Sequence, residues 1–401
     1  MKIAVITSAN LPVPAFNGGA IENLIDMYLS YNALNTHHKF VVYTILHKHH
    51  KDGTIKPNKY TDYYTINDKN IWYKIKRKIF RLTTKQYYSD GYLDFFLKTA
   101  LDNIKHKNFD LIIVENRGEF VPRIKEVINI PVILHIHNEF HSALHHLPLA
   151  KLILSKCDMI ITISDYILNV MKKNYPEVFG LTVLNGIREE QFKNAKSDRK
   201  KFGFKNDDFV IVYCGRLQSQ KGVKELIRGV KITSKTIPNI KLLIIGGANF
   251  GDKTKGETNQ YTEELKAEVK GIENMVKFTG FLPYNEVSVG YASSDIAIVP
   301  STWNEPAGQT AVEPMFVGIP LIVTKSGGLP QMVEDAAIQI DKDPKTLPQK
   351  IANAIIDLHN NPEKRLDLVQ RGKKRKEFLT AEKYGLHIME AIEKCVQKSK
   401  I

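Results

Sequence analysis

The sequence predicts an α/β protein built from two doubly wound, Rossmann-like domains. The chain has 401 residues, which exceeds one ordinary hydrophobic core and suggests two domains of about 200 residues each. Short apolar runs alternate with helical patterns along the chain, and this alternation is typical of parallel sheets covered by helices. The alternation by itself also fits other two-domain α/β proteins.

The first domain is expected to begin with a strand at 3–6 and a loop that ends in Gly18 and Gly19, where a helix would open. Small residues at a helix start let the backbone approach phosphate closely, although a plain strand-to-helix turn explains a glycine pair equally well. The remaining elements are expected as strands at 39–45, 110–115, 131–136 and 158–163, a loop at 47–64 and a helix at 93–105.

The stretch 69–86 is rich in basic residues and contains no acidic one. Large apolar side chains recur in it at helical spacing: Ile71, Trp72, Ile75, Ile79 and Leu82. This pattern predicts a basic amphipathic helix. Two interpretations stay open: an ordinary helix that packs its apolar residues on the core, or a segment that attaches to anionic lipid headgroups.

The strand expected to begin at Pro131 ends in two histidines, His135 and His137. Ligands of open α/β sheets lie at strand ends, so His137 is a candidate site residue. His135 would point the same way, but a hydrogen-bonded core histidine is the simpler interpretation. Three more histidines lack the carboxylate or cysteine of a typical metal site and are expected to be exposed: His141, His145 and His146.

The second domain is expected to follow a polar connection at 188–208 with a strand at 209–214 and a glycine turn that enters a helix. Arg216 and Lys221 flank this turn. Two fixed cations near helix-end amides would neutralise a diphosphate without a metal ion. Further elements are expected as strands at 239–245, 276–280, 295–300 and 321–324, helices at 348–359 and 381–396, and a polar loop at 248–262.

Two carboxylates, Glu305 and Glu313, lie in a loop and a short helix between two apolar runs of the second domain. Carboxylates only accept hydrogen bonds and take two hydroxyl donors at once, as a ribose or hexose diol presents them. Each glutamate taken singly also fits a solvated charge. The pair at the end of a strand predicts a sugar-binding or phosphate-binding crevice.

Together these motifs resemble glycosyltransferase family 4, a family of retaining GT-B enzymes that use nucleotide sugars. Ala307 departs from the family pattern, which has an aromatic or other apolar residue there, and Pro314 stands where alanine is usual. The resemblance covers nearly the full chain. It rests on Gly18-Gly19, Asn185-Gly186-Ile187, Gly215-Arg216-Leu-x3-Lys221-Gly222, Glu305-Pro306-x-Gly308-x4-Glu313, Gly318-x-Pro320 and Gly327-Gly328.

The resemblance implies a GT-B architecture with an acceptor-side domain at 1–186 and a nucleotide-sugar-binding domain at 187–380. A helix at 381–401 would return to the first domain. Transfer would occur with retention, and the leaving phosphate would take the acceptor proton, so no enzyme base is required. Catalysis would come from stabilising the leaving diphosphate and from aligning the substrates.

The resemblance also implies a role for each site residue. The catalytic residues would be Glu305, His137, Arg216 and Lys221, with His137 orienting the donor sugar. Arg216 and Lys221 would hold the diphosphate, Glu313 the ribose, and Glu305 with the amides after Pro306 the sugar hydroxyls. The full set expected to bind the nucleotide sugar is Gly18, Gly19, Arg216, Lys221, Phe281, Leu282, Glu305, Pro306, Ala307, Gly308, Gln309, Thr310 and Glu313.

The net charge of +14 calls for an anionic partner. No nucleic-acid module signature is present, so we expect no nucleic-acid partner. The resemblance implies a nucleotide-sugar donor, most simply UDP-linked, and a glycan or lipid-linked acceptor. The positive charge also suits an anionic membrane surface. No apolar run approaches the ~18 residues of a membrane span, and no charged leader precedes the first strand. Three scattered cysteines are expected to be buried in a reducing compartment: Cys157, Cys214 and Cys395. We therefore expect a cytoplasmic protein, either free or peripheral on the inner membrane face.

Two alternatives to transfer remain: a scaffold subunit with an inactive site, and a nucleotide-sugar epimerase. The presence of all expected charged residues argues against the first, and the Glu305-x7-Glu313 pattern argues against the second. No metal or cofactor is expected. Asp341 and Asp343 form the Asp-x-Asp metal pattern of a different glycosyltransferase fold, but in a late polar loop this match is attributed to coincidence.

Overall fold

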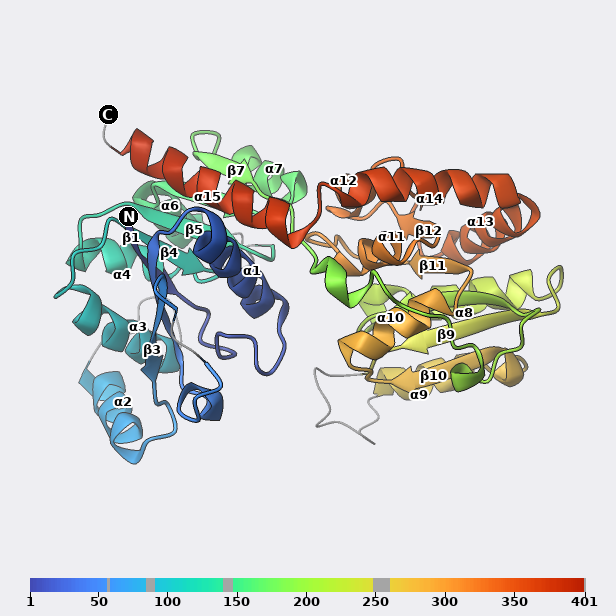
Figure 1. Ribbon diagram of the computed structural model, residues 1–401, viewed down its shortest axis with the longest axis horizontal. Coiled ribbons are helices and arrows are strands. Elements are labelled where there is room, and N and C mark those ends of the chain that lie inside the picture. Colours follow the sequence, from blue (N-terminus) through green and yellow to red (C-terminus); the bar gives the residue numbers. More distant parts are fainter. Residues whose placement is uncertain (56–57, 84–90, 140–146, 248–259, 400–401) are drawn as a thin grey trace. The chain divides into compact units, whose positions relative to one another are not determined.

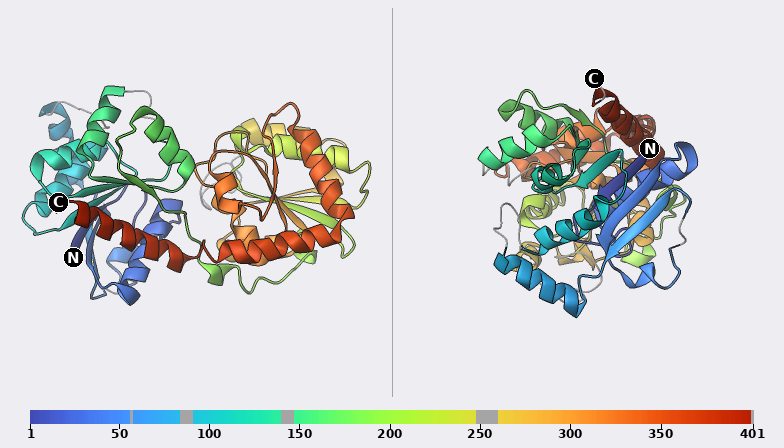
Figure 2. Two further views of the ribbon diagram at one scale, coloured as in Figure 1. Left: turned by 90° about the horizontal axis from the view of Figure 1, so that it is seen from above. Right: turned by 90° about the vertical axis from the view of Figure 1, so that its left-hand side faces the viewer.

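The structure is a computed structural model that describes residues 1–55, 58–83, 91–139, 147–247 and 260–399. It divides into two compact units (Figure 1): unit 1 is Met1–Gly186 with Ala381–Ile401, and unit 2 is Ile187–Thr380. These bounds coincide with those expected from the sequence. Each unit is a parallel sheet with helices on both faces (Figure 2), which confirms the predicted fold class.

In the described part of unit 1, seven parallel strands lie in the order β3-β2-β1-β4-β5-β6-β7. The strands are β1 Lys2–Ile6, β2 Lys39–Ile45, β3 Thr61–Ile66, β4 Leu111–Glu115, β5 Val132–Ile136, β6 Met159–Thr162 and β7 Gly180–Thr182. The central strands are mostly apolar because helices bury both of their faces, and their polar residues stand at or near the strand ends. The strand order reverses between β1 and β4, and ligands of open α/β sheets bind at such reversals.

The helices of unit 1 enclose this sheet. They are α1 Ala20–Asn35, α2 Ile71–Thr83, α3 Gly91–Ile104, α4 Phe120–Val127, α6 Leu147–Lys156, α7 Asp165–Asn174 and α15 Ala381–Lys398. The C-terminal α15 packs beside α1, where its Tyr384 and Ile388 share a core with Leu24 and Tyr28. The last helix of the chain therefore belongs to the first unit, as the sequence predicted.

In the described part of unit 2, six parallel strands lie in the order β10-β9-β8-β11-β12-β13. They are β8 Phe209–Cys214, β9 Ile240–Ile245, β10 Val276–Gly280, β11 Ile296–Val299, β12 Leu321–Thr324 and β13 Ile338–Ile340. The helices are α8 Val223–Thr233, α9 Gln260–Glu268, α10 Tyr284–Ala292, α11 Glu313–Val317, α12 Leu329–Val333, α13 Leu347–Asn360 and α14 Pro362–Lys376. The strand order reverses between β8 and β11, so the loops after these two strands border the site.

Several sequence-based expectations about elements are wrong. The loop expected at 47–64 ends in β3, an edge strand whose polar residues hide its pairing with β2. No element was predicted for the run around Ile338, which forms strand β13 and pairs with β12. Helix α14 is missing from the predictions because its sequence is mostly charged. Of the loop expected at 248–262, residues 260–262 begin α9, and the rest lies outside the described residues.

The basic stretch does form a helix, α2, and residues 84–86 lie outside the described part. Of the two interpretations left open, packing of its apolar residues on the core is wrong, because Ile71, Trp72, Ile75, Ile79 and Leu82 are exposed. Among the cysteines only Cys395 is buried, whereas Cys157 and Cys214 are partly exposed, and none of the three is in a disulfide. None of the helices in the described ranges has the length and apolar character needed to cross a bilayer.

Candidate active site

The turn after β8 holds the two cations expected to bind a diphosphate. Arg216 follows the strand, and Lys221 ends a short 3₁₀ turn that begins at Ser219. Gly222 then starts α8 in the left-handed conformation, at φ 69°. A side chain at Gly222 would collide with the carbonyl oxygen of Pro300, at the end of β11. Glycine therefore allows the turn to lie directly against the loop that carries Glu305.

Lys221 and Glu305 form an ion pair at this contact. The Lys221 Nζ lies 2.7 Å from Oε1 of Glu305, and the same oxygen accepts a hydrogen bond from Ser301 Oγ at 2.5 Å. The ammonium also lies 5.1 Å from the ring centroid of Trp303, a cation–π contact. The Lys221 side chain is 16% exposed and that of Glu305 is 7% exposed. The structure thus brings together a cation and a carboxylate that are 84 residues apart in the sequence.

The backbone around Glu305 is fixed by the loop after β12. The Gly328 N–H donates a hydrogen bond to the Glu305 carbonyl oxygen at 2.7 Å. A side chain at Gly327, which has φ 56°, would collide with that same carbonyl oxygen. The glycine pair at 327–328 therefore supports the carboxylate-bearing loop by close backbone contact.

Glu313 is the first residue of α11 and is 3% exposed. Its Oε2 accepts a hydrogen bond from the Tyr291 hydroxyl at 2.8 Å. Burial raises the pKa of Glu313 to about 7, although hydrogen bonds from Tyr291 and Tyr284 oppose this shift. The carboxyl group therefore changes charge near neutral pH and can act as either a donor or an acceptor of hydrogen bonds.

The other residues expected at the donor site lie on neighbouring loops of unit 2. Phe281 follows β10 and is 45% exposed, with Leu282 half-buried beside it. The segment from Pro306 to Thr310 joins Glu305 to Glu313: Pro306 and Ala307 are buried, Gly308 has φ 87°, and Gln309 starts a 3₁₀ turn. The predicted donor residues of unit 2 thus lie in the segments that follow β8, β10 and β11, with Glu313 at the start of α11.

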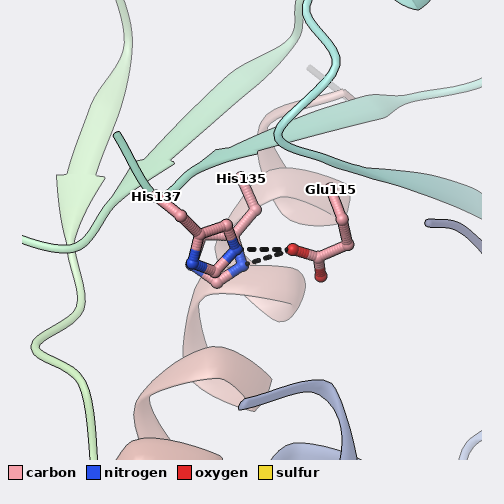
Figure 3. Close-up of side chains that lie close together, drawn as sticks. All are labelled: Glu115, His135 and His137. Atoms are coloured by element: carbon pink, nitrogen blue, oxygen red, sulfur yellow. Dashed lines mark hydrogen bonds and ion pairs between the residues drawn. The ribbon is translucent and has the colours of Figure 1, made fainter. Parts of the chain in front are cut away.

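A second polar cluster, in unit 1, contains the predicted His137 (Figure 3). Glu115 ends β4 and is paired in register with His135 on β5. Glu115 Oε2 lies 2.8 Å from Nε2 of His137 and 3.1 Å from Nδ1 of His135. Its other oxygen, Oε1, accepts a hydrogen bond from the Tyr28 hydroxyl at 3.0 Å. All three members of the Glu115–His135–His137 cluster are buried.

The protonation state of this cluster follows from its surroundings. Burial favours the neutral form of Glu115, but the two histidines outweigh it and hold the pKa of Glu115 well below its usual range. Burial, followed by the neighbouring His135, lowers the pKa of His137 to about 4. His137 is therefore a neutral imidazole at physiological pH that donates Nε2–H to the Glu115 carboxylate. Its buried Nδ1 has no hydrogen-bond partner within the described ranges, so it offers a lone pair.

Glu115, His135 and His137 are also a combination that could hold a metal ion, since one ligand atom from each lies within 4.8 Å of the others. The hydrogen bonds from the two histidines and Tyr28 already satisfy both carboxylate oxygens. The sequence analysis missed Glu115. An available signal was an acidic residue at the end of an apolar strand, next to a strand that ends in His-x-His.

Gly18 and Gly19, with φ 74° and 101°, open α1 as expected. The carboxylate of Glu22, in the first turn of α1, lies against Gly19 so closely that a side chain there would collide with it. Burial raises the pKa of Glu22 to about 7. An acidic group thus occupies the helix start where phosphate was one of the expected ligands. His141, His145 and His146 lie outside the described residues.

Comparisons with known proteins agree with this geometry. Residues 194–375 match the family model described as glycosyl transferases group 1. The chain is similar to the putative glycosyltransferase YtcC of Bacillus subtilis, with 27% identity over 88% of this chain and 82% of that protein. The chain is a GT-B glycosyltransferase. The prediction of glycosyltransferase family 4 agrees with these matches.

Two further matches cover almost the whole chain. Spore coat protein SA of Bacillus subtilis is 26% identical over 91% of this chain and 92% of its own length. The crystal structure of Anabaena HepE in complex with UDP covers 98% of this chain and 100% of HepE, with a TM-score of 0.74 and 20% identity. At this identity the HepE match establishes the fold.

Proposed function

We propose that this glycosyltransferase moves a sugar, with retention of configuration, from a UDP-linked donor to a glycan or lipid-linked acceptor in polysaccharide, glycolipid or cell-surface glycan synthesis. The observation that carries the proposal is the Lys221–Glu305 ion pair, on the turn that also bears Arg216. A UDP donor is supported by HepE, whose structures include complexes with UDP and with UDP-glucose. We place the activity in the cytoplasm, at the inner face of the membrane where lipid-linked acceptors are reached.

The ion pair suits a site that must receive an anion. An incoming diphosphate competes with Glu305 for the Lys221 ammonium, and Arg216 on the same turn adds a second cation. Glu305 then accepts hydrogen bonds from the sugar hydroxyls in place of its lysine. Glu313 accepts hydrogen bonds from the ribose, while Phe281 and Leu282 lie against the base.

In the transfer step, the bond between the sugar C1 and the leaving phosphate oxygen breaks while a bond from C1 to the acceptor oxygen forms on the same face. The leaving phosphate takes the acceptor proton, so no enzyme base is needed. Arg216 and Lys221 stabilise the negative charge that develops on the diphosphate. His137, which is neutral, places its Nδ1 lone pair or its carbonyl near the positive charge that develops on the sugar ring.

Two fixed cations replace the divalent metal that many nucleotide-sugar enzymes use, so we propose that the reaction needs no metal. The glycine pair at the start of α1 serves the acceptor side. A diphosphate there would meet the buried carboxyl group of Glu22, whereas an acceptor hydroxyl could donate a hydrogen bond to it. This assigns Gly18 and Gly19 to the acceptor rather than to the donor phosphate.

A thermal-shift panel of UDP, GDP and ADP, each with magnesium and with EDTA, tests the donor assignment. We expect UDP to raise the melting temperature equally in magnesium and in EDTA, and the shift to shrink in Glu313→Gln. The matched control is Glu268→Gln on α9, because Glu268 pairs with Arg228 away from the site. A shift that requires magnesium would overturn the metal-free proposal, and no shift with any nucleotide would overturn the donor site.

A GT-B scaffold subunit without turnover is the second candidate, because a relative of similar length carries the name of a spore coat protein. Hydrolysis of the UDP-sugar in the absence of acceptor separates the two. Slow release of UDP supports the transferase. Tight UDP-sugar binding with no release supports the scaffold, and conversion of the sugar to an isomer would instead indicate an epimerase.

A further inference from the structure

Helix α2 exposes an apolar face that no described part of the chain covers. Five large hydrophobic side chains of this helix are exposed: Ile71 (65%), Trp72 (68%), Ile75 (41%), Ile79 (56%) and Leu82 (80%). These five are among only twelve exposed large hydrophobic residues in the described part of the chain. Single exposed hydrophobics are ordinary, but five on one helix of thirteen residues mark a surface with a partner.

The five residues lie on one side of the helix. At about 100° per residue, they fall within an arc of about 100°. The opposite side is the one that packs on the protein: the rings of Tyr73 and Phe80 lie 4.8 Å and 5.5 Å from that of Phe95 on α3. The Arg123 guanidinium lies 5.9 Å from the Phe80 ring. Packing therefore holds the apolar face toward solvent.

Lysines border this apolar face on both sides. Helical geometry places Lys74 and Lys78 along one edge and Lys76 along the other, and all three are exposed. No acidic residue occurs between positions 69 and 86. Lysine stems extend along an apolar surface while their ammonium groups reach outward. The apolar face with its lysine borders thus has the chemistry of a surface made of acyl chains beneath anionic headgroups.

We propose that α2 anchors the enzyme to an anionic lipid bilayer, with the apolar face inserted at the boundary between headgroups and acyl chains. The helix lies at the periphery of unit 1, beyond β3 and α3, in the views of Figures 1 and 2. A second copy of the chain fits this face poorly, since two lysine-bordered faces would repel each other. The proposal goes beyond glycosyl transfer and does not depend on the identity of the donor.

Co-sedimentation with vesicles tests the anchor. The full chain is expected to pellet at low salt with vesicles of equal parts phosphatidylglycerol and phosphatidylcholine, and not with phosphatidylcholine alone. The double variant Trp72→Ser with Ile79→Ser should bind roughly tenfold more weakly or worse. The matched control is Leu366→Ser on α14, because Leu366 is 64% exposed and lies in unit 2. This control should pellet like the unchanged protein.

Lysine variants test the charge. The triple variant Lys74→Gln, Lys76→Gln and Lys78→Gln should lose most of its binding at low salt, and high salt should weaken the unchanged protein in the same way. The control is Lys373→Gln with Lys374→Gln, two exposed lysines on α14. Equal losses in both sets would show nonspecific attraction by net charge and would overturn the assignment to α2.

Tryptophan fluorescence reports insertion directly, because the chain has only two tryptophans, Trp72 and Trp303. In Trp303→Phe, the emission of Trp72 should shift to the blue with anionic vesicles and stay unchanged with neutral ones. If the emission of Trp72 does not shift, the proposed insertion is wrong. It is also wrong if the protein is a dimer in solution and the double variant Trp72→Ser with Ile79→Ser is a monomer. The UDP thermal shift of that double variant should be unchanged, so failure of the anchor and failure of the donor site are separate results.

Discussion

Each unit holds a polar cluster near the ends of neighbouring parallel strands, and the two clusters are built differently. In unit 2, Lys221 and Glu305 carry opposite charges, and their side chains remain 16% and 7% exposed. In unit 1, the Glu115 carboxylate is fully buried and is contacted by the imidazoles of His135 and His137 and by the Tyr28 hydroxyl.

This difference separates two tasks. A partly exposed ion pair can change partners, since an incoming diphosphate offers lysine another anion and sugar hydroxyls offer glutamate other donors. A fully buried carboxylate with three fixed hydrogen-bond donors cannot change partners without leaving those donors unsatisfied. Its effect is to hold His137 in one orientation and one protonation state. The unit 2 pair is thus suited to binding and the unit 1 cluster to positioning.

The largest expected effect concerns the cations of unit 2. If they stabilise the leaving diphosphate, Arg216→Ala and Lys221→Ala should each lower turnover of the UDP-sugar by about 10²–10³-fold. Release of UDP measures turnover, and thermal melting checks folding. The matched control is Lys266→Ala on α9, whose lysine pairs with Glu263 at 2.9 Å. Near-normal rates in both variants would show that Arg216 and Lys221 do not stabilise the leaving diphosphate. The Lys221–Glu305 pair would then be structural, like the Glu115 cluster.

The next effect concerns stability in unit 1. Glu115→Ala leaves the donors of His135, His137 and Tyr28 without an acceptor, which should lower the free energy of unfolding by about 3 kcal/mol. Denaturant unfolding measures this change. Asp62→Ala, which breaks an exposed pair with Lys39, should cost less than about 1 kcal/mol. A cost for Glu115→Ala no larger than for Asp62→Ala would contradict the positioning role.

A smaller effect concerns pH. The pKa of Glu313 is about 7, so its ionised form declines below pH 7. If that form accepts the ribose hydroxyls, UDP affinity should fall by up to about tenfold per pH unit below 7. Folding raises the pKa of Glu313 from 4.5 to about 7, so the folded state holds the proton more tightly than the unfolded state does. The unliganded protein should therefore lose stability as pH rises from 4.5 through 7.

Isothermal titration calorimetry measures the affinity for UDP. The titrations run from about pH 5.5 to about pH 8, on either side of the Glu313 pKa of about 7. Because a phosphate group itself titrates at a pKa of about 6, the control is Glu313→Gln, which keeps the contribution of the ligand and removes that of the enzyme. The pH dependence should therefore be shallower in Glu313→Gln. An unchanged slope would show that the ionisation of Glu313 does not take part in ribose binding.

The smallest effect is expected at Asp341, the first carboxylate of the Asp-x-Asp pattern. It is exposed and pairs with Lys350 at 2.9 Å and with Lys325 at 3.4 Å. Asp341→Asn should change turnover by less than about twofold, with or without magnesium, because exposed ion pairs contribute little. A large loss that magnesium rescues would assign this residue to a metal site and contradict the metal-free proposal.

Much of the fold could be predicted from the sequence. Strand β8 and the first four residues of β4 are apolar because helices cover both faces of a parallel sheet, so their runs stand out locally. The glycines at 222 and 327 mark close backbone contacts, which only a residue without a side chain permits. The edge strands β3 and β13 could not be recognised from apolar runs, because they are only partly buried and therefore contain polar residues.

The partners of the site residues were decided only by the tertiary structure. Motifs identified Lys221, Glu305 and His137, but Lys221 and Glu305 meet because β8 and β11 are neighbours in the sheet. Glu115 reaches His137 because β4 and β5 are likewise neighbours. Spacing along the chain does not encode such contacts, since strand order sets them.

Helix α2 shows the same division. Its sequence by itself determined an amphipathic helix with a basic character, because periodicity is a local property. Which side faces the protein depended on α3, where Phe95 packs with Tyr73 and Phe80. The more apolar side was thereby left exposed. Local sequence fixes the conformation of a segment, whereas the surfaces that neighbouring elements present fix which of its sides is buried.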